Sequence, residues 1–219
     1  MADVPYSTGE PMIGADVRPV IAQVVADPLP LGIGAFAMTT FALSIANTNV
    51  WGAAASTALS LALIFGGGVQ LLAGMWEFVR KNTFGATAFS SYGAFWISFY
   101  VYEKFFVPGL KPATATIATG VFLLCWTIFT FYMTIASFRV SMAVVAVFVL
   151  LLATYILLTI GVFEGMTGVY QWGGWIGVAT AAAAWYAATA GVVNETFKKA
   201  VIPVGSLAAP TPAAVAPRR

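Results

Sequence analysis

"WEFVRKNTFGATAFSSYG" occupies residues 76–93 and lies between two of the most apolar stretches of the chain. Glu77, Arg80 and Lys81 fall within five positions, and a run rich in Thr, Ser, Tyr and Gly follows them at once. Charge in such a place indicates that the chain leaves an apolar environment, turns in water and enters the apolar environment again. The segment therefore predicts the end of one membrane-spanning helix and the beginning of the next.

The composition of the whole chain agrees with this interpretation. Of its 219 residues, 60% are apolar and only 8% are charged. A soluble domain carries about a quarter charged residues, because its surface must face water. Inside a lipid bilayer, helices satisfy their own backbone hydrogen bonds. The chain is therefore predicted to be an all-α integral membrane protein.

Apolar runs without charge define the expected spans. Each run is long enough to cross a hydrocarbon core of about 30 Å as a helix. Only Ser137 and Arg139 separate the fourth run from the fifth, but together these two runs are too long for one span. We expect a six-helix transmembrane domain over 27–199, a polar arm over 1–26 and an Ala/Pro-rich tail over 200–219. The six runs are 31–50, 54–76, 84–102, 113–138, 140–163 and 171–193.

The positions of Lys and Arg predict the orientation. Six spans put both ends of the chain on one side of the membrane. Of the basic residues, only Lys104 and Lys111 then fall on the other side. Because cytoplasmic loops are enriched in Lys and Arg, we expect a multi-pass protein of the plasma (inner) membrane with both termini in the cytoplasm.

The ionisable residues exclude several classes of function. Histidine is absent and Cys125 is the single cysteine, so imidazole chemistry and a cysteine metal cluster are excluded, and we expect no enzyme, no metal and no cofactor. A proton-driven pump usually holds a carboxylate near the middle of the membrane, and no apolar run has one. A net charge of +2 gives no reason to expect nucleic acid as a partner. A passive or loosely coupled conduit fits best.

Polar residues within the spans are the candidate pathway. In the third span, Thr87 and Ser91 belong to one small, polar stripe, and in the first span Thr39 and Thr40 share a face with an aromatic residue. Gln70 places a primary amide at membrane depth, where it must find a partner or face water. Each of these residues either lines a pathway or belongs to a helix-packing seam, and the sequence leaves both readings open.

Charged residues at the ends of the spans also allow two interpretations. Glu77 precedes Arg80 and Lys81, and Glu195 precedes two lysines, at the spacing of helical ion pairs. These groups form either salt bridges of little individual value or an electropositive vestibule that gathers anions. The candidate residues of this cytoplasmic mouth are Asp27, Glu77, Arg80, Lys81, Asn194 and Glu195.

Three segments resemble the acetate uptake transporter family, which includes the succinate–acetate permeases of bacteria and their yeast relatives. The most specific is "AGMWEFVRKNTFGATAFSSYGAFW" at 73–96. "DPLPLGIGAFAMTT" at 27–40 is similar to the N-terminal signature of the family, and "NETFKKAVIPVG" at 194–205 to its C-terminal one. One departure is Asp27, which stands where the family usually has Asn.

The resemblance implies six helices in each protomer and a hexamer in which every protomer has its own pathway. It also implies a hydrophobic constriction of Phe36, Leu151 and Tyr92, with Leu151 taken from the weakly matched fifth span. The implied substrates are small carboxylates, acetate foremost and succinate as a further candidate. A conduit for another small solute, or a membrane sensor or scaffold without transport activity, remains the alternative.

Overall fold

Ten helical segments make up the computed structural model, which describes residues 25–207, so most of the expected arm and part of the expected tail lie outside the described residues. Seven of these segments are α-helices, and with α3 and α4 taken together as one span they begin and end close to the six predicted spans. The helical segments are α2 (Leu29–Asn47), α3 (Ala54–Leu63), η1 (Ile64–Val69), α4 (Gln70–Val79), α5 (Thr83–Val101), η2 (Tyr102–Phe106), η3 (Val107–Gly109), α6 (Pro112–Ser137), α7 (Met142–Phe163) and α8 (Thr167–Phe197).

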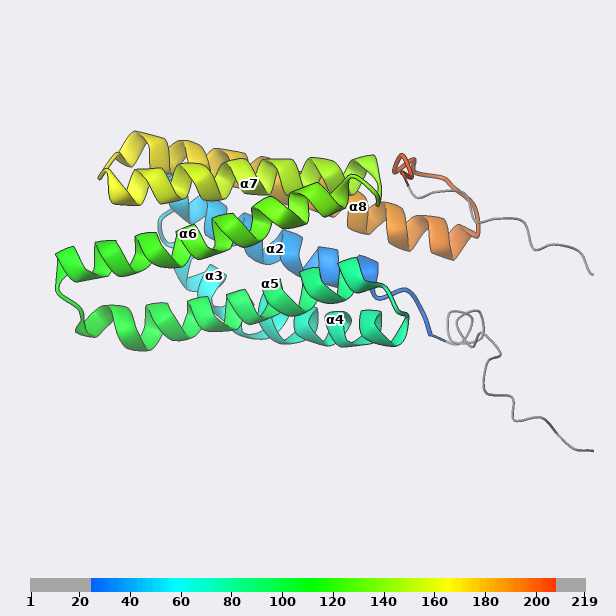
Figure 1. Cartoon of the computed structure of the whole chain (residues 1–219), viewed down its shortest axis with the longest axis horizontal. Coiled ribbons are helices and arrows are strands. Elements are labelled where there is room, and N and C mark those ends of the chain that lie inside the picture. The colour runs from blue at the N-terminus through cyan, green and yellow to red at the C-terminus, as the bar shows by residue number, and fades with distance from the viewer. Residues whose placement is uncertain (1–24, 208–219) are drawn as a thin grey trace, which may run out of the picture.

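The helices run up and down the long axis as a bundle (Figure 1). Because α3, η1 and α4 form one continuous rod, the bundle has six rods, and the first and last described helices meet the rest of the chain at the same end. Five rods in the described part are both long and apolar enough to cross a membrane. The exception is α5, whose Ser, Thr, Tyr and Gly residues lower its hydropathy although its length of 19 residues suffices.

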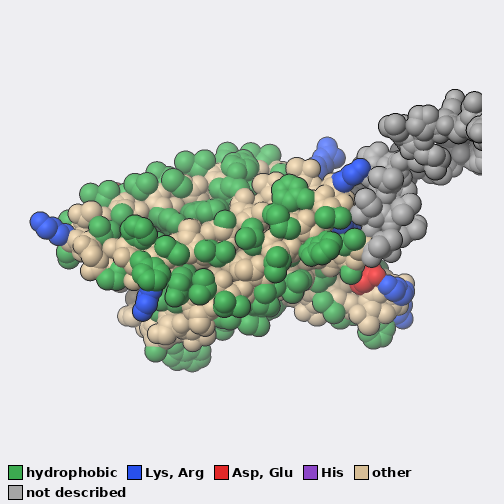
Figure 2. Space-filling view, turned by 90° about the horizontal axis from the view of Figure 1, so that it is seen from below, with side chains coloured by type: hydrophobic (Ala, Val, Ile, Leu, Met, Phe, Trp, Pro, Cys, Tyr) green, Lys and Arg blue, Asp and Glu red, His purple; other side chains and the backbone are tan. Residues whose placement is uncertain are grey.

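The surface fits a membrane environment. Figure 2 shows apolar side chains along the length of the bundle on the face it presents, with Lys and Arg gathered toward the two ends. Large aromatic and aliphatic side chains are exposed on the bundle, among them Ile128, Phe131 and Ile135 on α6. Exposed apolar area of this extent is typical of a surface that meets lipid or another subunit. The protein is an all-α membrane protein, as its composition predicts.

Side chains at the turns explain why the helices begin where they do. The Asn82 side chain accepts a hydrogen bond from Gly85 N at 3.2 Å and caps α5. Ser141 caps α7 in the same way, with 3.3 Å from Val144 N to its Oγ. Such caps satisfy backbone donors that the first turn leaves free. The predicted break between the fourth and fifth spans, at Ser137 and Arg139, is confirmed by a turn between α6 and α7.

Small residues let the rods approach closely. A Cβ atom built on Gly74 of α4 would lie 2.5 Å from the backbone nitrogen of Ser90 of α5, and one on Gly93 of α5 would lie 2.7 Å from Leu71 N. On the other side of the bundle, a Cβ on Gly174 of α8 would lie 2.7 Å from Thr48 N. In lipid, close packing of this kind drives helix association. The glycines thus fix the distances between rods, and α2 lies packed against α8, α4 and η1.

Candidate transport pathway

A cavity of about 290 Å³ opens within the bundle, away from the end at which α2 begins and α8 ends. We call it the large cavity. Its walls come from all six rods and from η2, so residues far apart in the sequence meet around one space. Since a water molecule takes about 30 Å³ in the liquid, the large cavity has room for a small organic ion with some of its hydration water.

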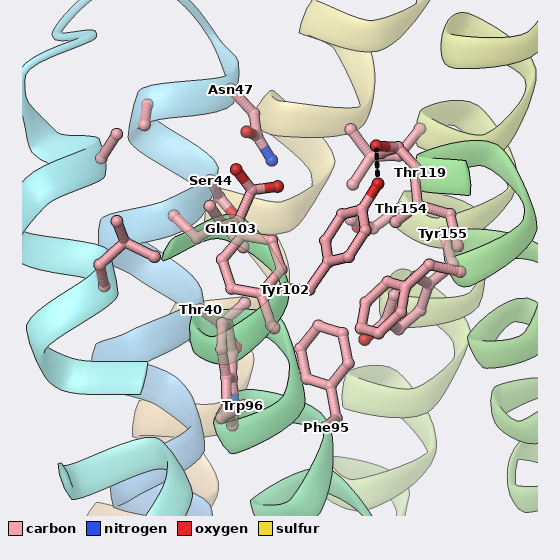
Figure 3. A pocket seen from close by; sticks show the side chains of 18 of the residues that line it. Thr40, Ser44, Asn47, Phe95, Trp96, Tyr102, Glu103, Thr119, Thr154 and Tyr155 are labelled. Carbon is pink, nitrogen blue, oxygen red and sulfur yellow. Dashed lines mark hydrogen bonds between the residues drawn. The ribbon is translucent and has the colours of Figure 1, made fainter. Parts of the chain in front are cut away.

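Polar side chains gather at the mouth of the large cavity (Figure 3). Tyr170 of α8 donates a hydrogen bond to Asn47 Oδ1 at 3.1 Å, and Tyr102 Oη lies 2.8 Å from Thr119 Oγ1. The Glu103 carboxylate faces the amide of Asn47. This mouth is therefore built from hydroxyl, amide and carboxyl groups, and it suits a hydrated solute.

Two hydrogen-bonding groups deeper in the large cavity have no partner in the described part of the chain. They are Thr40 Oγ1 on α2 and Trp96 Nε1 on α5, and both side chains are buried. A buried donor without a partner destabilises the folded protein by about 1–3 kcal/mol, because it has given up its hydrogen bond to water. Hydroxyl and indole N–H groups are both donors, so the pair presents an arrangement that an anion can satisfy.

A second cavity, of about 40 Å³, lies toward the end at which α2 begins and α8 ends. We call it the small cavity. Its lining is almost wholly apolar, with Gln70 as an exception: this side chain is 1% exposed and its Oε1 has no hydrogen-bond partner among the described residues. Between the two readings left open for Gln70, the structure favours a residue that borders a cavity over one that is paired with a neighbouring helix.

Phe36 of α2 and Leu151 of α7 line both cavities. Tyr92 of α5 lines the small cavity, and its ring centroid lies 5.8 Å from that of Phe36. All three side chains are buried in the core of the bundle. The residues that the resemblance singles out therefore lie close together, where the two cavities approach each other.

Tyr92 is held in place by its surroundings. Its hydroxyl lies 2.8 Å from Thr130 Oγ1 of α6, and its ring packs edge-on against Phe129 at a centroid distance of 5.2 Å. Phe148 of α7 and Trp126 of α6 also contact the ring. A phenol packed in this way has little rotational freedom.

Other candidate pathway residues lie elsewhere. Thr39 packs against Gly66, and its hydroxyl donates a hydrogen bond to Ala35 O of the same helix at 3.0 Å. Thr87 and Ser91 are partly buried and line neither of the two cavities. In the same polar stripe of α5, Ala94 and Ser98 are exposed, so this stripe faces the outside of the bundle. The structure therefore favours the packing interpretation for Thr39, whereas Thr87 and Ser91 lie on a stripe that borders neither cavity.

The candidate mouth residues at the other end form two separate contacts. The Arg80 guanidinium pairs with the Asp27 carboxylate, which also accepts a hydrogen bond from Leu29 N at 3.0 Å. Glu77 is 0% exposed and accepts a hydrogen bond from Asn82 Nδ2 at 2.9 Å. The expected ion pair of Glu77 with Arg80 is thus replaced by an ion pair of Arg80 with Asp27, because α2 begins beside the turn between α4 and α5.

The Asn194 side chain forms hydrogen bonds with the segment that follows α8. Its side chain accepts hydrogen bonds from Val201 N and Ile202 N and donates one to Ile202 O, all at 2.8 Å. Glu195 pairs with Lys198, as the helical spacing predicts, and with Asp27 it lines an open groove at this end of the bundle. Lys81 is exposed. Asn194 therefore secures the chain after α8, while Lys81 remains available to solutes.

Several cavity residues were missed from the sequence. Trp96 belongs to an aromatic stripe that indicates a helix face but does not tell core from cavity. Asn47 and Glu103 stand at the predicted ends of spans, where polar residues are expected in any membrane protein. Their position around one cavity comes from tertiary packing. Among residues 25–207, no group of three His, Cys, Asp or Glu side chains is placed to hold a metal ion.

Comparison with known proteins gives consistent matches. Residues 9–209 match the model of the GPR1/FUN34/yaaH family. Accumulation of dyads protein 2 of Saccharomyces cerevisiae is 41% identical over 187 residues, which cover 82% of this chain. The chain spans 65% of the length of that yeast relative.

Bacterial relatives match over nearly their whole length. The succinate-acetate/proton symporter SatP of Escherichia coli is 35% identical over 181 residues, which cover 83% of this chain and 96% of SatP. A solved structure described as the bacterial acetate channel SatP has a TM-score of 0.78 and 35% sequence identity, and the match covers 83% of this chain and 99% of that chain. Both the family model and these relatives support one conclusion: this chain belongs to the GPR1/FUN34/yaaH family, which is the acetate transporter family.

Proposed function

We propose that this protein is a plasma-membrane channel or permease for small carboxylates, with acetate as its foremost substrate and succinate as a further one. The two cavities form its pathway through the protomer. Its relatives support this assignment, because one is named for succinate and acetate and another for an acetate channel. Transporters and channels, rather than enzymes, make up this family.

The observation that carries the proposal is a pair of buried donors inside the large cavity, Thr40 and Trp96, which have no hydrogen-bond partner among residues 25–207. Their hydroxyl and indole N–H groups bind the carboxylate oxygens of the substrate. Hydrogen bonds to a charged acceptor are stronger than those between neutral groups. The aromatic and aliphatic remainder of the lining accommodates the methyl group of acetate.

The neck of the pathway is formed by Phe36, Leu151 and Tyr92. An ionised carboxylate is costly to dehydrate in an apolar constriction. The donors of Thr40 and Trp96 on one side and the amide of Gln70 on the other reduce this cost, because they hold the ion immediately before and after the neck. The neck therefore limits the rate of passage and excludes larger solutes.

The arrangement in the membrane follows from charge. The end at which α2 begins and α8 ends carries Arg80, Lys81, Arg139 and the lysines after α8, and it faces the cytoplasm. The mouth of the large cavity then faces the outside. The exposed apolar surface of α6 and the polar stripe of α5 are available for contacts between protomers, and we propose a homohexamer with one pathway in each protomer.

Flux of radiolabelled acetate into proteoliposomes tests the proposal, with empty liposomes as the control and size-exclusion chromatography as the check of folding. We expect uptake that succinate competes for and that needs the protein. Folded protein without acetate flux would contradict the proposal and favour a sensor or scaffold. Repeating the measurement at neutral and acidic pH, with and without a membrane potential, distinguishes passage of the anion from proton-coupled transport.

A further inference from the structure

Among the described residues that line the large cavity, Glu103 is the one with a formally charged side chain. It lies on η2, immediately after the α5 span, and its side chain is partly buried. Figure 3 shows its carboxylate turned toward Asn47 and the interior of the cavity mouth. A negative charge in this place meets every solute that enters the proposed pathway.

The neighbours of Glu103 do not neutralise its charge. The other ionisable side chains that line the large cavity in the described part of the chain are the phenols of Tyr102, Tyr155 and Tyr170, and Tyr100 on α5 is a further phenol beside η2. A phenol is ordinarily uncharged near neutral pH. The mouth receives Asn47 from α2 and Thr119 from α6, and η3 has no ionisable side chain. Lys104, the next residue in the chain, is exposed and does not line the cavity.

A fixed carboxylate in a partly enclosed space repels a bound anion in proportion to the charge of that anion. Acetate carries one negative charge at neutral pH, whereas succinate carries two. The repulsion by Glu103 therefore acts on succinate about twice as strongly as on acetate. The low dielectric constant of the surrounding helices strengthens this difference relative to bulk water.

We infer that Glu103 is a charge filter at the mouth of the large cavity, which makes the pathway favour monocarboxylates over dicarboxylates. This inference rests on the proposed carboxylate transport. Tyr170 donates a hydrogen bond to Asn47 Oδ1, and the amide of Asn47 faces the Glu103 carboxylate (Figure 3). The filter discriminates by charge, whereas the neck discriminates by size and hydration.

Protonation switches the filter off. Burial raises the pKa of the Glu103 carboxyl above its ordinary value. The fraction of protonated Glu103 therefore begins to grow at a higher pH than for an exposed glutamate, and it increases as the pH falls. An acidic exterior thus weakens the discrimination against dicarboxylates.

Paired flux measurements at pH 7.5 test this inference. Radiolabelled acetate and succinate are supplied separately to proteoliposomes that contain the original protein, Glu103→Gln, Glu103→Asp or Glu164→Gln. Glu164 is the matched control, because it is exposed at the same end of the bundle and does not line the cavity. Size-exclusion chromatography confirms that each variant is folded.

We expect Glu103→Gln to raise both fluxes and to raise the ratio of succinate to acetate flux roughly three- to tenfold, because one repulsive charge disappears. Glu103→Asp keeps the charge, and Glu164→Gln leaves the mouth unchanged, so both should retain the original ratio. At pH 5, with equal pH on both sides, the difference between the original protein and Glu103→Gln should shrink.

Two results would contradict the role of Glu103 as a charge filter without contradicting acetate transport. One is an unchanged flux ratio in folded Glu103→Gln. The other is a loss of acetate flux in that variant, which would make Glu103 a residue required for transport. Absence of acetate flux in the original protein is a separate result, and it would contradict the proposed function together with this inference.

Discussion

Tyr92 has two separable parts, a ring at the proposed neck and a hydroxyl directed at Thr130. The ring contributes the apolar surface next to Phe36, and the hydroxyl ties α5 to α6. The sequence predicted that Phe36 and Tyr92 belong to one constriction through a family resemblance, and the structure places their rings 5.8 Å apart. It did not predict the bond to Thr130, because nothing in the sequence pairs residues 38 positions apart.

Substitutions of Tyr92 separate these two roles. Tyr92→Phe removes one buried hydrogen bond and should cost about 1 kcal/mol of stability, with little widening of the neck. Tyr92→Ala removes the ring, so we expect water to enter the neck, acetate flux to rise severalfold and selectivity against larger carboxylates to fall. Acetate and propionate fluxes, together with thermal melting in detergent, measure both effects. Wild-type flux and selectivity in folded Tyr92→Ala and in Phe36→Ala would exclude the proposed neck.

The packing of α4 against α5 depends on two glycines placed in a reciprocal manner. Gly74 of α4 meets Ser90, and Gly93 of α5 meets Leu71, so each helix brings its backbone close to the other. This contact positions both Gln70 and Tyr92 at the small cavity. A change in the distance between the two helices therefore acts directly on the proposed pathway.

Gly93→Ala tests this contact. The added methyl group would lie 2.7 Å from Leu71 N, a backbone atom that cannot move independently of its helix. Overpacking of this kind costs roughly 1–3 kcal/mol, so we expect a lower melting temperature and a lower yield of folded protein. Gly168→Ala is the control, because no neighbouring atom lies within 4 Å of its Cβ. Equal melting temperatures for the two variants would show that α4 and α5 tolerate separation.

At the level of helices, the sequence predicted the number and the approximate bounds of the six rods. Apolar length and charged turns carry that information, even at the weakest boundary beside Arg139. The π-helical turn η1 was not predicted, although it coincides with the three glycines at 66–68, because glycine allows several backbone paths. The sequence also did not determine whether the polar stripe of α5 faces a pathway or a packing interface, because hydroxyl groups occur in both.

Across the described part of the molecule, positive charge gathers at the end at which α2 begins and α8 ends. Arg80 is paired there with Asp27, whereas Lys81 is exposed. Asp27, the departure from the usual Asn of the family, thus neutralises part of the charge that would form an electropositive vestibule. At this end, the ion-pair interpretation therefore applies to Arg80, and the vestibule interpretation applies to Lys81.

Salt dependence distinguishes the two contributions. Arg80→Gln combined with Lys81→Gln should lower acetate flux severalfold at low ionic strength. In about 1 M salt, where the screening length is about 3 Å, the effect should nearly vanish if these charges attract the anion. Lys81→Gln alone should reproduce most of the salt-dependent loss of acetate flux, because Arg80 is already paired with Asp27. A loss that is independent of salt would assign both residues to packing.

In the proposed function, carboxylates pass through the large cavity of each protomer. Thr119 lines the cavity mouth, whereas the natural Cys125, six positions further along α6, is exposed and lines neither cavity. These two positions allow a thiol to be moved from the outside of the bundle to the pathway on one helix. The double variant Thr119→Cys with Cys125→Ser is compared with the original protein.

The most direct measurement is acetate flux in proteoliposomes before and after complete reaction of each protein with a small, membrane-permeant thiol reagent, with the extent of reaction determined by mass spectrometry. We predict that modification blocks most of the flux in the double variant, that acetate slows this modification, and that modification of Cys125 in the original protein leaves flux intact. Full modification of the double variant without loss of acetate flux would contradict passage through the cavity.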